Sequence, residues 1–206
     1  MAPLTRLIRY GDHIEMSWKN GGGQTREIAR QDDSEGLVWR LSLATITKSG
    51  PFSLFPGLDR IIALIEGPSM VLHFEDGETL ELNPAVPRRF SCDRPLQAHL
   101  PSSEECRDLN LLFRRSDIDA RAETIKLSVS RQLGWTGVNV VICFALSGII
   151  DLGVDAESAH TISAGETFIC NNPDPSTGFS FFLKTATPGA ELVLFMISPA
   201  RASGVA

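Results

Sequence analysis

Short apolar segments recur along the whole chain, and each ends at Gly, Pro, Asn or Asp. No segment keeps apolar residues at positions i, i+3, i+4 and i+7 for three turns, so helical periodicity is missing. Turn signals such as Glu75-Asp76-Gly77 and Thr187-Pro188-Gly189 separate the segments. The pattern predicts an all-β protein. Strands are predicted over 25–29, 39–46, 61–65, 70–74, 78–82, 109–113, 125–130, 138–146, 149–154, 159–162, 179–183 and 192–197.

Few short helices are expected, and one segment carries a helix-start signal. Ser116 can act as an N-cap and Asp119 can complete a capping box. A short helix is therefore predicted over 116–123.

The two halves of the chain resemble each other at a spacing of about 80 residues. The apolar run and glycine of 60–67 are echoed by 141–148, and 108–113 is echoed by 190–195. Amphipathic strands can also produce such similarity by chance. We predict a duplicated cupin or jelly-roll-like barrel (bicupin-like), whose closed sheets avoid exposed edges. The first half spans 1–115 and the second 116–206, packed as one compact unit.

Composition excludes several classes of partner. The chain has 206 residues and a formal net charge of −6, so no overall basic field exists for nucleic acid or anionic membrane. No apolar run reaches the length of a membrane span, and the start lacks the regions of a signal peptide. We expect a cytoplasmic protein. Its four cysteines form no C-x-x-C pair and are expected to be reduced thiols.

Metal and nucleophile motifs are missing. His13, His73, His99 and His160 are all more than five residues apart, which does not fit the His-x-His spacing of a metal-dependent cupin. No G-x-S-x-G or phosphate-binding loop occurs. We therefore expect neither a metal site nor a cofactor.

Two polar stretches stand out in the first half. Residues 18–28 (WKNGGGQTREI) combine three glycines with hydrogen-bonding side chains; they form either an anion-binding turn or a flexible hairpin tip. Residues 50–60 (GPFSLFPGLDR) form a stiff loop that delivers Arg60 to the start of an apolar strand. A charge in such a strand needs a partner.

Strand alternation indicates which side chains share a face. Arg40, Ser42 and Ala44 face one way along 39–45, opposite Trp39, Leu41 and Leu43. Asp108, Asn110 and Leu112 share a face, and so do Arg60, Ile62, Leu64 and Glu66. These polar faces suit either solvent or the hollow interior of a barrel.

Taken together, these segments resemble the HutD/Ves family. The resemblance rests on 18–28, Trp39-Arg40-x-Ser42-x-Ala44, the 50–60 segment, Glu66-Gly67 and Asp108-Leu109-Asn110, in this order over about the first 115 residues. It implies a cupin-type fold with two barrel-like halves. It also implies a link to histidine utilisation, in which such proteins are proposed to bind N-formylglutamate or urocanate and to limit flux.

The resemblance places a small anionic ligand, N-formylglutamate, urocanate or a formate-like carboxylate, in the first half. We expect Arg40 or Arg60 to hold its carboxylate in two places. The remaining candidate ligand-binding residues are Asn20, Gly22, Thr25, Ser42 and Asn110.

Two other functions stay open. A metal-independent cupin enzyme, an isomerase or hydrolase of a small organic acid, would use Glu27 or Glu66 as general base. A protein-interaction module would instead expose a large apolar patch. Pairing through sheet edges would give a homodimer.

Overall fold

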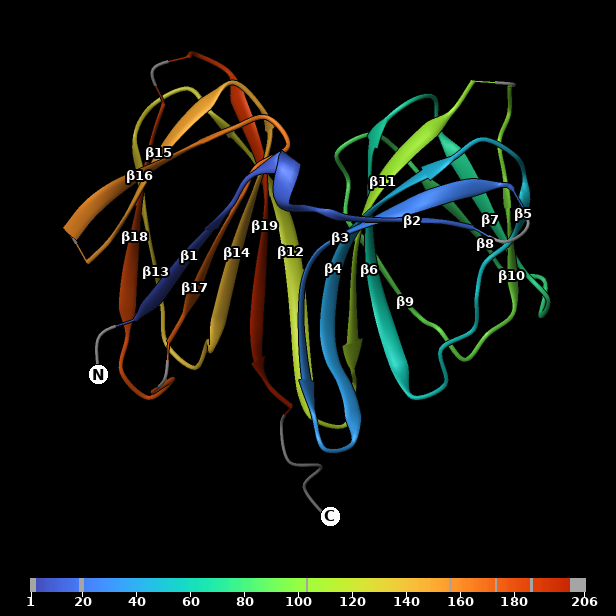
Figure 1. Cartoon of the computed structure of the whole chain (residues 1–206), viewed down its shortest axis with the longest axis horizontal. Coiled ribbons are helices and arrows are strands. Elements are labelled where there is room, and N and C mark those ends of the chain that lie inside the picture. The colour runs from blue at the N-terminus through green and yellow to red at the C-terminus, as the bar shows by residue number, and fades with distance from the viewer. Residues whose placement is uncertain are drawn as a thin grey trace. The chain divides into compact units, whose positions relative to one another are not determined.

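The computed structural model describes residues 3–18, 21–102, 104–155, 157–172, 174–185 and 187–200. Its contacts divide the chain into two compact units, His13–Asp117 and the combination of Met1–Asp12 with Ile118–Ala206. Within the described residues, every regular element is a strand except the short 3-10 helix η1 (Tyr10–Asp12). Each unit consists of two antiparallel sheets (Figure 1). The all-β prediction is confirmed.

The unit His13–Asp117 contains a six-stranded and a four-stranded sheet. The six-stranded sheet has the order β2 (Ile14–Ser17), β3 (Gly23–Asp33), β4 (Gly36–Ile46), β11 (Cys106–Arg114), β6 (Leu58–Glu66) and β9 (Arg88–Ser91). The four-stranded sheet has the order β5 (Gly50–Pro51), β10 (Leu96–His99), β7 (Met70–Phe74) and β8 (Thr79–Leu82). Apolar side chains of both sheets, including Ile62, Leu72 and Leu112, form one buried cluster. Burial of this cluster holds the two sheets together.

The other unit repeats this plan. Its five-stranded sheet has the order β1 (Leu4–Ile8), β17 (Thr167–Asn171), β14 (Val140–Ser147), β19 (Ala190–Pro199) and β12 (Ile118–Leu127). Its four-stranded sheet has the order β13 (Arg131–Trp135), β18 (Phe179–Thr185), β15 (Ile149–Val154) and β16 (Glu157–Ser163). Phe168 and Phe181, both fully buried, pack edge to face in its core.

Equivalent glycines occupy equivalent turns in the two units. Gly67 follows β6 with φ of 96°, and Gly148 follows β14 with φ of 75°. A Cβ on Gly67 would lie 2.6 Å from the carbonyl oxygen of Glu105, and one on Gly148 would lie 2.6 Å from the Cβ of Ala190. In both units the glycine lets the turn pass close to the residues that begin the last strand of the larger sheet.

Two details differ from the sequence-based picture. The predicted helix over 116–123 is wrong: Asp117 closes a turn on Arg114, and β12 begins at Ile118. In addition, β1 pairs with β17 in antiparallel register, so the first twelve residues join the unit of residues 118 onward (Figure 1). The division at residues 115 and 116 does not include this feature.

All four cysteines are free and buried. Burial raises the pKa of each thiol, and that of Cys170 to about 12. Because the thiolate is the reactive form, we expect iodoacetamide at pH 8 to leave the folded protein unmodified and to alkylate all four thiols in urea. Mass spectrometry measures the extent of alkylation in the folded and in the urea-unfolded protein. Rapid alkylation of the folded protein would contradict the burial of the four thiols.

Candidate functional site

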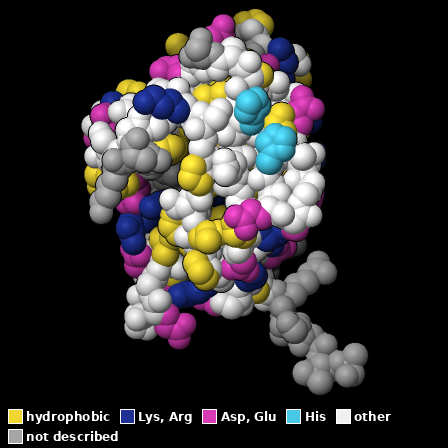
Figure 2. Space-filling model, turned by 90° about the vertical axis from the view of Figure 1, so that its right-hand side faces the viewer, with side chains coloured by type: hydrophobic (Ala, Val, Ile, Leu, Met, Phe, Trp, Pro, Cys, Tyr) yellow, Lys and Arg dark blue, Asp and Glu magenta, His cyan; other side chains and the backbone are white. Residues whose placement is uncertain are grey.

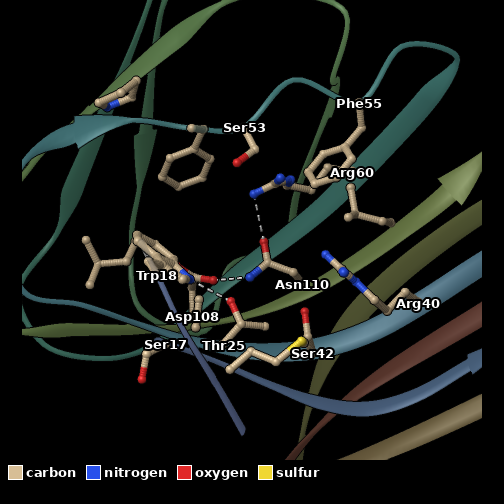
Figure 3. A pocket seen from close by; sticks show the side chains of 16 residues that line it. Ser17, Trp18, Thr25, Arg40, Ser42, Ser53, Phe55, Arg60, Asp108 and Asn110 are labelled. Carbon is tan, nitrogen blue, oxygen red and sulfur yellow. Dashed lines mark hydrogen bonds between the residues drawn. The ribbon is translucent and has the colours of Figure 1, made fainter. Parts of the chain in front are cut away.

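A cavity of about 470 Å³ lies in the unit His13–Asp117. Strands of its larger sheet form the floor, and the segment from β5 toward β6 covers it with two phenylalanines (Figure 3). The lining residues are Met16, Ser17, Trp18, Thr25, Arg40, Ser42, Ala44, Ile46, Pro51, Phe52, Ser53, Phe55, Arg60, Asp108, Asn110 and Leu112.

Register positions the polar residues on the floor. Leu112 of β11 lies opposite Arg40 on one neighbouring strand and Arg60 on the other. Two residues along β11, Asn110 lies opposite Ser42 of β4. Since directly opposed residues share a face of the sheet, these side chains converge on the cavity. The alternation predicted from the sequence therefore describes this floor correctly.

Arg60 is 8% exposed, and aromatic rings surround its guanidinium. The guanidinium carbon lies 4.9 Å from the ring centre of Phe52, 5.9 Å from that of Phe55 and 5.8 Å from that of Phe90. Its Nη1 donates a 3.4 Å hydrogen bond to Oδ1 of Asn110, while Nε has no partner. Cation–π contacts hold the charge in this apolar wall without neutralising it.

Arg40 contributes a second guanidinium at the same end of the cavity. Its guanidinium carbon lies 5.7 Å from the ring centre of Phe55, and its Nε also lacks a partner. Burial lowers the pKa of Arg40, the Glu27 carboxylate raises it, and the neighbouring charges of Arg60 and Arg30 lower it further. Among the described residues, neither arginine forms an ion pair with a carboxylate.

Asp108 is the carboxyl group of the site, and it is fully buried. Oδ1 accepts a hydrogen bond from Nδ2 of Asn110, whereas Oδ2 has no partner. Burial raises its pKa to about 7, although the Arg60 charge and the Asn110 hydrogen bond both lower it. The carboxyl group therefore changes charge near neutral pH, a property common at functional sites.

Trp18 lies in the cavity wall. The indole Nε1 donates a 2.8 Å hydrogen bond to Oγ1 of Thr25. A Cβ on Gly23 would lie 2.2 Å from the Thr45 carbonyl oxygen and 3.1 Å from the Trp18 ring. Gly23 is thus required for close packing of the indole against β3 and β4.

Most of the predicted ligand-binding residues meet in this cavity. Thr25, Arg40, Ser42, Arg60 and Asn110 line it. Gly22 does not; it is buried, and its carbonyl accepts a hydrogen bond from the Thr47 amide. Asn20 lies outside the described residues. Asp108 and the three phenylalanines around Arg60 are additional site residues. Asp108 carried a signal through its alternation with Asn110, and Phe52 and Phe55 lie in the 50–60 segment that the sequence singled out; Phe90 carried none.

The two glutamates considered as general bases do not line the cavity. Glu66 pairs with Arg107 at 2.7 Å. A register shift between Arg107 and Asp108 breaks the alternation there, so Glu66 lies opposite Arg107 rather than on the Asp108 face. The Glu27 carboxylate lies 3.7 Å from Nη1 of Arg30.

The histidines lie elsewhere. His73 and His99 are exposed on β7 and β10, with ring centres 6.2 Å apart, and Figure 2 shows adjacent histidines on the surface. Within the described part of the chain, no three His, Cys, Asp or Glu side chains are grouped to hold a metal ion. The cavity chemistry therefore comes from arginine, amide, hydroxyl and carboxyl groups.

The sequence and the fold are both similar to those of known proteins. A model described as HutD matches residues 10–188. The chain belongs to the HutD family. This HutD-family chain is 28% identical to HutD from Pseudomonas fluorescens, solved in a formate condition, with a TM-score of 0.78 over 97% of this chain and 100% of that one. It is also 27% identical to a conserved protein of unknown function from Pseudomonas aeruginosa. The TM-score is 0.86, and the match covers 95% of this chain and 99% of that one.

More distant structures share the fold of the HutD-family chain. A variant of oxalate decarboxylase from Bacillus subtilis is 11% identical, with a TM-score of 0.64 over 93% of this chain and 76% of that one. The match supports the duplicated cupin-like fold. As for the membrane, the described residues include no helix with the length and apolar character needed to cross it.

Proposed function

We propose that this HutD-family protein binds a small carboxylate in the cavity of His13–Asp117, and that this binding regulates histidine utilisation. The observation that carries the proposal is the pair of guanidiniums of Arg40 and Arg60. Both line the cavity and neither has a carboxylate partner among the described residues. A ligand carboxylate supplies the missing charge.

The energetics favour this ligand class. A hydrogen bond to a charged group contributes about 1.5 to 3 kcal/mol, so two or three such bonds, together with apolar contacts to the phenylalanines, are enough for micromolar binding. Ser42, Thr25 and Asn110 offer neutral hydrogen bonds to the rest of the ligand. The family link supports N-formylglutamate or urocanate as the ligand, and the formate condition of the P. fluorescens structure makes formate a third probe.

Arg60→Gln is expected to weaken carboxylate binding on the order of 100-fold, because truncating a buried charged contact costs at least about 2 to 3 kcal/mol. Calorimetric titration with N-formylglutamate, urocanate, formate, glutamate and histidine measures the dissociation constants. Thermal unfolding with each compound at millimolar concentration gives an independent reading, since ligand bound only by the folded state stabilises it.

Arg107→Gln is the matched control. Arg107 lies on β11 and pairs with exposed Glu66, outside the cavity lining. Its replacement removes an arginine of the same unit and leaves the cavity charges unchanged. Equal affinities for the parent, Arg60→Gln and Arg107→Gln would contradict the proposed carboxylate site.

The regulatory part needs a test in cells. The chromosomal copy is replaced by the Arg60→Gln or the Arg107→Gln variant, and intermediates are measured during growth on histidine. Altered urocanate or N-formylglutamate levels in the first strain alone support regulation through the cavity.

One observation favours a second candidate function, a metal-independent enzyme. Asp108 is a carboxyl group in the cavity with a pKa of about 7, near the value that suits a general acid or base. Incubation of each compound with the protein, followed by NMR, detects turnover. An enzyme would convert one of them and lose this activity in Asp108→Asn.

A further inference from the structure

The cavity contains a hydrogen-bond acceptor that the protein leaves unused. Asp108 has no exposed surface, and its Oδ2 has no hydrogen-bond partner in the structure. Its other oxygen accepts from Nδ2 of Asn110. Burying a carboxylate oxygen without a partner is costly, so such an atom in a cavity wall points to a donor that arrives with a ligand.

The charges of the cavity are also unevenly distributed. Arg40 and Arg60 flank Leu112 at one end of the β11 face, and Asp108 lies four residues along the same strand. Asn110 lies between them and connects the two ends, because it accepts from Arg60 and donates to Asp108 (Figure 3). One end therefore attracts an anion, and the other end repels an anion and accepts a hydrogen bond.

We propose that Asp108 is a specificity-determining residue, which selects carboxylates that carry an N–H or O–H donor a few atoms from the carboxylate. This inference rests on the proposed carboxylate site and adds the second group that a ligand must have. The carboxylate lies between the guanidiniums, and the donor of the ligand reaches Oδ2 of Asp108. An amide fits both ends, whereas an ester of the same shape leaves Oδ2 without a partner.

The Asp108→Asn variant reverses this chemistry without changing the shape of the residue. Asn110 donates to one oxygen of Asp108 through Nδ2. In the variant that position must still accept, so the amide oxygen of the new asparagine takes it. The amide nitrogen of the new side chain then occupies the Oδ2 position, and an acceptor in the wall becomes a donor.

Two pairs of isosteric probes test the selection by calorimetric titration of the full chain at pH 8. N-methylsuccinamate and monomethyl succinate differ only in an amide N–H against an ester oxygen, and N-methylglutaramate and monomethyl glutarate repeat the comparison in a longer chain. We expect the parent to bind the better amide at least 10-fold more tightly than its ester. Asp108→Asn is expected to reduce this preference below 3-fold or to invert it.

Asp93→Asn is the matched control, because Asp93 pairs with Arg115 outside the cavity lining; it should keep the parental preference. Equal binding of amide and ester by the parent, lost in Arg60→Gln, would overturn the selection by Asp108 and leave the carboxylate site standing. A preference that persists in Asp108→Asn would also overturn it. If the parent and Arg60→Gln bound the probes with equal affinity, or if no probe bound at all, both proposals would be overturned.

Discussion

Replacing Asp108 by asparagine is expected to stabilise the protein at pH 8, in contrast to the usual effect of altering a buried polar residue. The pKa of Asp108 is raised from its usual 3.8 to about 7, because the folded protein buries the carboxylate. Because the folded protein favours the neutral Asp108 carboxyl, its contribution to the free energy of unfolding is fully present below the unfolded-state pKa. This contribution is lost as the pH rises through about 7, where the carboxyl ionises in the folded protein. Asparagine stays neutral throughout.

The pH dependence gives this prediction its sign and size. The parent loses about 1.4 kcal/mol of unfolding free energy per pH unit relative to Asp108→Asn below about pH 6, and this loss levels off above about pH 7. Between pH 5 and pH 8 it amounts to about 3 kcal/mol in total. Urea unfolding of both proteins at pH 5, 6, 7 and 8 measures this difference. A difference that stays constant over this range would show that Asp108 is already ionised at pH 5.

Asp93→Asn is the control of opposite sign. Hydrogen bonds from Arg115 and Gly57 hold the pKa of Asp93 at about 2. Its contribution is therefore present above the unfolded-state pKa and is lost only in acid. Between pH 5 and 8 this variant should differ from the parent by a constant amount.

Gly67→Ala and Gly148→Ala are expected to destabilise the protein by about 2 to 5 kcal/mol each. The left-handed backbone costs an alanine about 1 to 2 kcal/mol, and an atom forced into a packed site costs about 1 to 3 kcal/mol more. Both costs apply, because each position has positive φ and a contact of 2.6 Å for the added Cβ. Urea unfolding measures the loss.

Gly77→Ala separates the two costs. Gly77 also has positive φ, 92°, but an added Cβ would meet nothing within 4 Å. This variant should lose only the backbone part, about 1 to 2 kcal/mol. If all three variants lost equal stability, the close approach at Gly67 and Gly148 would contribute nothing.

Strand alternation predicted most of the candidate site. Arg40, Ser42 and Asn110 lie on the cavity face because regular strands alternate. The prediction fails where the strand is irregular: the register shift at Arg107 and Asp108 separates Glu66 from the face of Leu64. Spacing along one strand contains no information about a bulge in its pairing.

Other features depend on tertiary contacts. Phe90 reaches Arg60 from β9, a short strand that starts with two arginines and has no apolar run to reveal it.

The wrong helix prediction over 116–123 also has a physical cause. Burial alternates in the first part of β12, from Ile118 to Arg121, and changes phase before Ile125. In between, small alanines alternate with charged residues, so the hydrophobic contrast is weak and the helix-capping signal outweighed it.

The pairing of β1 with β17 has a consequence for folding during synthesis. Residues His13–Asp117 form one continuous unit, which can fold as soon as they have left the ribosome. β1 is made before that unit, yet its partner β17 lies about 160 residues later, so Leu4–Ile8 stay without this partner until those residues have been synthesised. Closing so long a loop is entropically slow. β1 therefore joins its sheet only after β17 has been synthesised, although it precedes every other strand of that sheet in the sequence.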